Sequence, residues 1–574
     1  MAWRQSFYVA VLLGAFVSSA HAQIYRWDNG QVIPGTEGIK LGPALRFSFW
    51  ESEPHNLRYA DFSTNFNLSS GDFHYSWLDY ARFQGDNLAN VDFEDSVLNH
   101  ANLKNANLTN ARLYFAALDG ANLTGAVITG ANLGEVTLRG FTAAQLYSTK
   151  NYAVKDLHGI KLGENNLDGW DFHDQNLANA DFGSSTLANA NLAGANLTNA
   201  ALSVRGLTNA NLTGAVVTGA SFDFATSVGF TAAQLYSTQS YAAKNLSGIR
   251  LGDNNLSGWD FHEQNLVNAY LVNTTLTNAN LAGANLTNAR MEMSTFTNAN
   301  LTGANLTNSV LLSSHFTNAN LTGADVRGAW VTDLAGAISK NTILPDSQLN
   351  GLNLASGEQL LVRNYHGNPD RGIKKIPVKI NSSLTISTGG LLSLQLDGQP
   401  WDSIVRFQTG IPVQLGGKLE LNFTDDTQLA AQPGRSIKVF DWTGVTPQGQ
   451  FTVQGQSGTE WDTGNLYTTG EVTLLGISSD LDADRDVDSS DLTEFLKNWT
   501  GSAYATADKT WHDGDSDHDG DVDSADTLVF LSQWTGATAA EALPAISVPE
   551  PSGLAMLCLI APALVRRSRN RSRR

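Results

Sequence analysis

The sequence predicts an all-β fold: a parallel β-solenoid with square coils, then a β-rich module and a small α-helical module. Three observations support this. Apolar residues recur at every fifth position through much of the first half of the chain. The next segment consists of short alternating runs, and two aspartate-rich loops precede helical stretches near the C-terminus. At 574 residues the chain is also too long for one globular core.

Residues 1–22 have the pattern of an export signal. Arg4 precedes an apolar run from Val9 to Val17, and an Ala-x-Ala ending stands before Gln23. We therefore expect an exported protein of the cell envelope, on the outer surface or in the extracellular matrix. The single cysteine, Cys558, lies in the C-terminal tail, so the exported fold has no disulfide framework.

The period of five runs from Leu68 to Leu138, from Leu157 to Phe222 and from Leu246 to Val331, usually with alanine two places earlier. Five is neither the helical period of 3.6 nor the strand period of 2. It fits a square coil in which each pentapeptide forms one side and points its large apolar residue and its alanine inward. Four sides give about twenty residues per coil, and stacked coils let asparagine amides pair along the axis.

This pattern resembles the pentapeptide repeat family, whose consensus is A(D/N)LXX. The resemblance covers residues 55–335 and implies a right-handed quadrilateral parallel β-helix. It implies a fold and no particular activity.

A longer repeat interrupts the solenoid, because the segment FTAAQLYST occurs twice, 89 residues apart. Its Thr-x-x-Gln spacing fits a capping box, which predicts short helices near 141–150 and 230–239. These inserts either pack over the coil or form an aromatic ligand site. The matched histidines that follow them, His173 and His262, are interpreted as surface residues rather than metal ligands.

Residues 340–477 are predicted to form a β-rich module, either a sandwich or an irregular continuation of the solenoid. Short segments of its sequence weakly resemble the repeats of autotransporter-like surface proteins. We expect it to cover the open end of the coil stack, since an exposed edge would promote aggregation. It shows no acid/base pair and no nucleophile. The strand-like runs are Gln359–Val362, Ile376–Ile380, Leu391–Leu396, Lys418–Phe423, Ser436–Phe440 and Glu471–Leu475.

Residues 478–540 contain the densest chemistry, two aspartate-rich loops displaced by 35 positions. Oxygen ligands at loop positions 1, 3, 5, 7, 9 and 12 can surround a hard cation, so we expect two Ca²⁺ sites. Helices follow, at Leu492–Trp499 and Thr527–Trp534. The predicted metal ligands are Asp480, Asp482, Asp484, Asp486, Asp488 and Asp491 in the first loop, and Asp515, Asp517, Asp519, Asp521, Asp523 and Asp526 in the second.

The duplicated loop and helix resemble the type I dockerin module. The second loop has Gly520 at the sharp turn, whereas Arg485 departs from the pattern in the first. The resemblance implies that loop positions 10 and 11 select a cohesin-like partner. Residues 480–526 hold 15 acidic and 3 basic side chains, so calcium is expected to drive folding of this module; the alternative is an acidic disordered linker. The positions implied to bind the partner are Ser489, Ser490, Ser524 and Ala525.

Residues 547–574 are predicted to be a sorting signal. Pro549, Glu550 and Pro551 precede an apolar run that ends in an arginine cluster. This order resembles the PEP-CTERM signal, which implies transient membrane association, processing by an exosortase-type enzyme, and delivery to the surface or an exopolysaccharide matrix. A permanent weak anchor is the alternative.

These features together predict an exported, non-catalytic structural or binding protein that docks through calcium. One alternative is a component of a cohesin–dockerin type assembly that degrades polysaccharide, or a carbohydrate-active β-helix enzyme. Another is a DNA-mimicking inhibitor. The repeat region argues against nucleic-acid mimicry, because residues 55–340 carry only 22 acidic and 14 basic side chains.

Overall fold

The computed structural model describes most of the repeat region and of the β-rich module. The described residues form two compact units, one ending at Asn255 and the other beginning at Leu256. The predicted export and sorting signals, 1–22 and 547–574, lie outside them. The described residues are 23–36, 39, 41–45, 56–63, 65–367, 376–397, 399–424, 434–456, 458–477, 479–481, 487, 489–499, 514–515, 522, 526–527 and 529–530.

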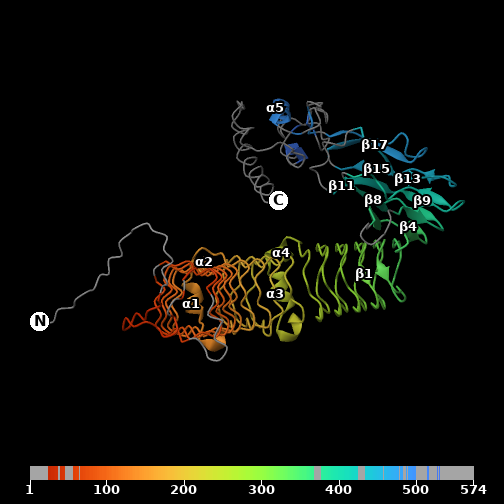
Figure 1. Cartoon of the computed structure of the whole chain (residues 1–574). Helices are drawn as coiled ribbons and strands as arrows, with labels where there is room; N and C mark the ends of the chain where they lie inside the picture. Colours follow the sequence, from red (N-terminus) through yellow and green to blue (C-terminus); the bar gives the residue numbers. More distant parts are fainter. Residues whose placement is uncertain are drawn as a thin grey trace. The chain divides into compact units, whose positions relative to one another are not determined.

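In the first unit, parallel β-bridges join residues twenty positions apart, such as Asn87 with Asn107. Four pentapeptides thus complete one coil, and the coils stack on one another (Figure 1). Central apolar residues and the preceding alanines, such as Leu103 and Ala101, are buried as predicted. Leu138 is an exception to the predicted pattern. It is 73% exposed because the chain leaves the coil there in a 3-10 helix.

The corners of the coils have left-handed backbone two positions after each central apolar residue. Asn105 and Asn110 occupy such corners with φ of 57° and 55°. Glycine and asparagine tolerate this conformation better than other residues do. Gly125 follows Asn105 one coil later, and a Cβ atom on it would lie 2.3 Å from the Asn105 Oδ1 atom. Close stacking therefore also requires glycine at some corners.

A small hairpin covers the edge of the first coil. Tyr25 forms an antiparallel bridge with Val32, and Arg26 forms another with Ala60. The flanking Ile24 is fully buried. The hairpin satisfies backbone groups that would otherwise form an open β-edge.

Two inserts interrupt the first unit and lengthen one coil each, because the bridges Asn132–Lys161 and Ser221–Arg250 span 29 positions instead of 20. Both contain the predicted capping boxes and extend beyond the predicted helices on both sides. The elements are η1 (Thr137–Arg139), α1 (Ala143–Tyr147) and α2 (Lys150–Ala153) in the first insert, and η2 (Ala225–Val228), α3 (Ala232–Tyr236) and α4 (Gln239–Ala242) in the second (Figure 1).

The second unit begins with coils of the same kind. Asn280 bridges Asn300, and the short strands β1 (Val310–Leu311) and β2 (Trp330–Val331) pair in parallel. The coil stacking continues past residue 335, to the bridge between Asp325 and Ile343.

Three parallel four-stranded sheets follow, and successive strands enter them in rotation. Each turn thus contributes one strand to every sheet, which makes a three-sided parallel β-helix. Of the two predicted arrangements, the structure shows a continued solenoid rather than a sandwich. The sheets are β3 (Gln348–Leu349), β6 (Val378–Ile380), β9 (Val405–Phe407) and β13 (Phe440–Asp441); β4 (Leu352–Leu354), β7 (Leu384–Ile386), β10 (Val413–Leu415) and β14 (Gln448–Gly449); and β5 (Gln359–Arg363), β8 (Leu391–Leu396), β11 (Lys418–Phe423) and β15 (Thr452–Gly455).

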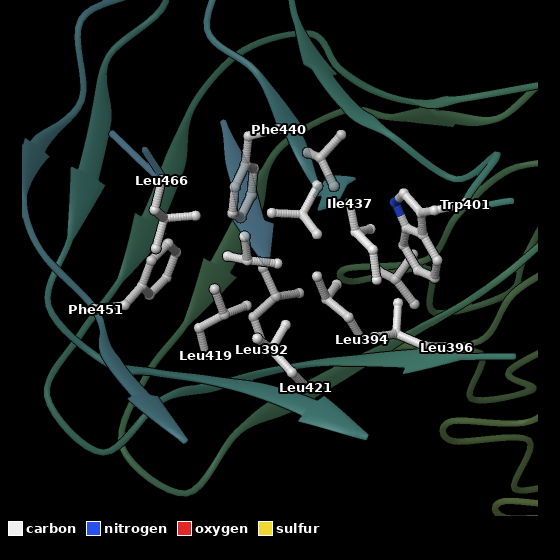
Figure 2. Packing of buried hydrophobic residues seen from close by; sticks show 14 of the residues in the cluster. Leu392, Leu394, Leu396, Trp401, Leu419, Leu421, Ile437, Phe440, Phe451 and Leu466 are labelled. Carbon is white, nitrogen blue, oxygen red and sulfur yellow. The ribbon is translucent and has the colours of Figure 1, made fainter. Parts of the chain in front are cut away.

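The interior of this β-helix is apolar. Figure 2 shows leucines of β8 and β11, including Leu392 and Leu419, facing Phe440 and Phe451. An antiparallel sheet of β12 (Ser436–Lys438), β17 (Glu471–Ile477) and β16 (Thr459–Asp462) adjoins it, and α5 (Ser489–Lys497) follows. Within the described ranges, no helix combines the length and the apolar character needed to span a membrane.

A polar network around a buried ion pair joins the square coils to the three-sided β-helix within the second unit. The Asp325 and Arg327 side chains are fully buried, and their closest atoms are 2.6 Å apart. The Arg327 guanidinium also donates to Ser403 Oγ at 2.7 Å and to the Arg363 carbonyl at 2.8 Å. Tyr365 Oη donates to Asn308 Oδ1 at 2.8 Å beside this pair. Each coil type therefore supplies part of one polar network.

Candidate functional site

The predicted calcium loops are described only in part. Asp480, Asp491, Asp515 and Asp526 are placed, and Ser489 and Ser490 form the backbone at the start of α5. This helix begins three residues before the predicted Leu492, because the last part of the loop is already helical. The remaining site residues lie outside the described part of the chain: Asp482, Asp484, Asp486, Asp488, Asp517, Asp519, Asp521, Asp523, Ser524, Ala525, Pro549, Glu550 and Pro551.

The first loop returns to its own beginning. Asp491, at loop position 12, lies in the first turn of α5 and is fully buried. Its Oδ1 atom accepts a hydrogen bond of 2.6 Å from the backbone N–H of Leu481, at loop position 2. A loop that surrounds a cation needs this closure, because ligands from both of its ends must converge.

The two loops share an apolar core. Val487 and Val522 are both buried, and they occupy the same position in the two copies. The Phe495 and Phe530 rings, also matched, are 4.8 Å apart between centroids. Sequence reasoning missed these four residues, although the displacement of 35 positions that relates the aspartates relates them too. The duplication therefore builds one paired unit rather than two separate loops.

The described carboxylates suit a cation chemically. Asp491 and Asp526 are fully buried and Asp515 is 2% exposed. Burying ionised carboxylates is costly unless they are paired, hydrogen-bonded or bound to a metal, and calcium prefers carboxylate and carbonyl oxygens. Among the residues that the structure places, no group of three or more His, Cys, Asp or Glu is arranged to hold a metal. The twelve-ligand assignment thus stays a prediction.

The first insert uses its aromatic residues for packing. Tyr147 Oη accepts a hydrogen bond from the Asp171 backbone N–H at 2.5 Å, and Tyr152 Oη donates to the Asp171 carbonyl at 3.1 Å. Burial, followed by the nearby Asp171 carboxylate, raises the pKa of Tyr152 to about 12. Trp170 is only 9% exposed beside them. The insert is therefore packed over the coil, the first of the two interpretations.

The matched histidines lie on the surface as predicted. His173 Nδ1 is 3.0 Å from the Ala193 carbonyl, and its Nε2 is 3.1 Å from Asp174. His262 Nε2 is 3.5 Å from Glu263. Both rings contact local groups on the outside of their coils.

A polar cluster that sequence reasoning missed lies on loops after β5 and β8. His366 Nε2 is 2.8 Å from Asp397, and His366 Nδ1 is 3.2 Å from Asp402. Burial alone would raise the pKa of Asp397, but hydrogen bonds from Asn364 and His366 hold that pKa below its usual range. Both ring nitrogens face carboxylates, so the cluster ties the two loops together. Nothing in the sequence pointed to this cluster, because His366 lies 31 residues from Asp397 and 36 residues from Asp402.

A family model described as pentapeptide repeats matches the chain in eight copies, over residues 78–114, 87–125, 106–142, 156–203, 245–292 and 294–329. A search of curated proteins finds no match.

Among solved structures, the chain is similar to QnrB1, a plasmid-mediated fluoroquinolone resistance protein, with 16% identity, 45% of this chain and 88% of that chain covered, and a TM-score of 0.15. It is also similar to HetL, a pentapeptide repeat protein involved in heterocyst differentiation regulation in the cyanobacterium Nostoc, with 22% identity, 51% and 90% covered, and a TM-score of 0.11. A pentapeptide repeat protein of the Arabidopsis thaliana thylakoid lumen has 22% identity, 23% and 64% covered, and a TM-score of 0.10.

Proposed function

We propose that this chain, which contains pentapeptide repeats, is an exported, non-catalytic structural or binding protein of the bacterial surface or exopolysaccharide matrix. The filled interior of the coils supports this role. Leucine, phenylalanine and alanine occupy it, so the solenoid offers its outer surface to other molecules. On this reading the coils display binding groups and hold them at fixed spacing.

We assign calcium-dependent docking to the C-terminal module. The observation that carries this assignment is the return of the Asp491 carboxylate to the backbone of Leu481. With calcium bound, the charge of the ion would offset the repulsion among the loop carboxylates. The Phe495–Phe530 contact would hold the two helices together. Ser489 and Ser490 begin α5 at this junction, where a cohesin-like partner would meet the paired loops.

Delivery to the surface is proposed from the two ends of the sequence. The export signal of residues 1–22 and the Pro549–Pro551 motif with its arginine-rich end support secretion followed by exosortase-type processing. Mass spectrometry of the protein from envelope fractions tests this step. A chain that keeps residues 547–574 would contradict removal of the tail.

Calcium titration of the exported full chain tests the docking module. We expect two binding events by isothermal calorimetry, one lost in Asp491→Asn and the other in Asp526→Asn. Asp462→Asn, an exposed aspartate outside the loops, serves as the matched control and should keep both. Equal heats in all four proteins would overturn the metal assignment.

A pull-down with a cohesin-domain panel then tests the partner class. Retention in calcium and release by chelator, absent in the Asp491→Asn variant, would support a cohesin-like partner. Retention that persists in chelator would contradict calcium-dependent docking.

A further inference from the structure

One outer face of the first coils differs from all the coil faces that follow it. We call it the N-terminal aromatic face and define it by Trp27, Tyr59, Tyr75, Trp77 and Tyr80. Tyr75 is 58% exposed, Tyr80 is 39% exposed and Trp27 is 38% exposed. Bridges place Trp77 in the middle of this side of the coil, between the corners occupied by Tyr75 and Tyr80. At the Tyr80 corner the later coils carry mostly glycine or asparagine, whereas the Tyr75 corner later carries acidic residues and also Phe115 and Phe224.

Three of these aromatic residues sit in a backbone conformation that does not suit them. Tyr59, Tyr75 and Tyr80 have φ of 61°, 57° and 59° at coil corners. Corners elsewhere carry mostly asparagine or glycine, which adopt left-handed backbone at lower cost. Tyrosine at these corners therefore costs more backbone strain than asparagine would.

The aromatic residues are held in place before any ligand arrives. The Tyr59 and Tyr80 rings stack with centroids 5.0 Å apart and planes within 3°. Trp27 packs against Tyr59 at 5.8 Å and donates its indole N–H to the Tyr80 carbonyl at 2.7 Å. The Tyr80 ring also stacks on His100 at 4.8 Å, so it lies between two rings. Tyr75 stacks on His74 at 3.9 Å and is the most exposed ring of the face. Rigid aromatic side chains lose little entropy when they bind.

The charges on this face are balanced. The Arg58 guanidinium lies 4.6 Å from the Trp77 ring and pairs with Asp79 at 2.9 Å. Arg82 lies 4.0 Å from the Trp27 ring, with its nearest atom 3.8 Å from Asp61. Anionic polymers bind to uncompensated positive charge, which these pairs do not offer. Paired guanidinium and carboxylate groups beside aromatic rings offer donors and acceptors to neutral hydroxyl groups.

We propose that the N-terminal aromatic face binds a neutral polysaccharide. A sugar ring has an apolar C–H surface that packs against the exposed Tyr75 ring, and a hydroxyl rim that hydrogen-bonds to Arg58, Arg82 and their aspartates. The proposal deepens the matrix role proposed above and rests on it, but it uses surface groups far in sequence from the calcium loops. Its success or failure can thus be separated from theirs.

Affinity electrophoresis of the full exported chain tests the proposal, with gels containing hydroxyethyl cellulose, xyloglucan or dextran as neutral probes and alginate or heparin as anionic ones. The test variant is Tyr75→Asn/Tyr80→Asn, which installs a residue that many other corners carry. The control is Phe224→Asn, an exposed aromatic corner outside the face with φ of 61°. Circular dichroism checks that both variants are folded.

We expect at least one neutral polysaccharide to retard the chain, with and without chelator. The double variant should bind about tenfold more weakly or worse, and Phe224→Asn should bind like the parent chain. Equal retardation of the double variant and its parent would overturn the proposal. Retardation by the anionic polymers alone, or by none of the neutral probes, would overturn it as well.

Discussion

Asparagine has two separate tasks in these repeats. Before the central apolar residue it forms amide ladders along the axis, as when Asn107 donates to Asn87 at 3.0 Å and Asn87 to Asn67 at 2.9 Å. Two positions after that residue it supplies left-handed backbone, as at Asn105. The period of five predicts the ladders, because it places like residues in columns. The corner role could not be predicted from periodicity, since it depends on the φ angle at each turn.

Replacing a strained corner should stabilise the first unit. Phe224 has φ of 61° and is 58% exposed, so its ring contributes little packing. We expect Phe224→Asn to raise the free energy of unfolding by about 0.5–1 kcal/mol, because asparagine tolerates this backbone better. Denaturant unfolding measures the change. Its buried neighbour Phe222 provides the opposite reference, since Phe222→Ala should lower stability by about 3–5 kcal/mol.

Asp86 is a buried acid in a position that normally holds alanine. An extra residue between Asp61 and Asn67 lengthens the first coil, as bridges of 21 rather than 20 positions show. The Phe66 N–H donates to Asp86 Oδ1 at 2.8 Å at this irregularity. Burial raises the pKa of Asp86 to about 7 despite that hydrogen bond. The Asp86 carboxyl group thus accepts the Phe66 N–H where the extra residue interrupts the regular coil. Its burial makes ionisation of this group unfavourable.

The stability of the first unit should depend on the protonation of Asp86. Its folded pKa lies above the unfolded value, so stability falls as pH rises from about 4 to about 7 and is constant above that range. Asp86→Asn keeps an acceptor for Phe66 and cannot ionise. We expect it to exceed the parent chain by on the order of 2 kcal/mol at pH 8 and to match it at pH 4. Denaturant unfolding at both pH values measures the difference in stability between the variant and the parent chain. A difference that does not change with pH would contradict the titration of Asp86.

At the scale of elements, the inserts show how local sequence and coil geometry combine. The Thr142–Gln145 capping box was readable in the sequence, and it is present. The Gln145 side chain also donates to the carbonyls of Leu118 and Ala121, at 2.7 and 2.9 Å. The second insert repeats these contacts through Gln234. They could not be predicted, since their partners lie more than twenty residues away along the chain.

Removing this glutamine should loosen the insert. Gln145→Ala breaks the capping box and two hydrogen bonds to the coil, so we expect a loss of about 2–3 kcal/mol. Hydrogen exchange should accelerate in α1 and α2. The exposed Gln239 of α4 is the control, and Gln239→Ala should change exchange little. Equal effects of the two substitutions would contradict the role assigned to the Gln145 side chain.

The β-rich module shows where strand prediction from sequence ends. Its longer strands, such as β8 and β11, were predicted because six residues suffice to show alternation. Strands of three residues, such as β4, β7 and β10, are too short for any period to appear. The turns also differ in length, so no fixed repeat marks them. The three-sided arrangement therefore follows from the pairing of strands and not from a pattern.

At the scale of the second unit, a polar network around the buried Asp325–Arg327 pair links its square and three-sided coils. Asp325→Leu alone leaves a buried guanidinium without its carboxylate and should cost about 3–5 kcal/mol. Asp325→Leu/Arg327→Met removes both charges and should lose less. Thermal unfolding of the two variants tests this order. A double variant less stable than the single one would show that the remaining hydrogen bonds of Arg327 outweigh the ion pair.

For the whole molecule, the sequence predicted the repeat fold and the likeness of the two aspartate loops. The repeat fold was predictable because a strict period reports stacking directly. The closure between Asp491 and Leu481 supports the loop assignment, whereas the shared core of Val487, Val522, Phe495 and Phe530 was not foreseen. Aspartate spacing describes ligands within one loop and says little about how two loops pair.

The most direct test of the account is calorimetry of the full exported chain with calcium and with chelator. We expect chelator to abolish or lower only the transition of residues 478–540, while the transitions of the repeat coils keep their temperatures. Asp491→Asn should reproduce part of that loss in calcium. Thermograms that are unchanged by chelator would contradict calcium as the organiser of the docking module. A shift of every transition would contradict a solenoid whose stability is independent of the metal.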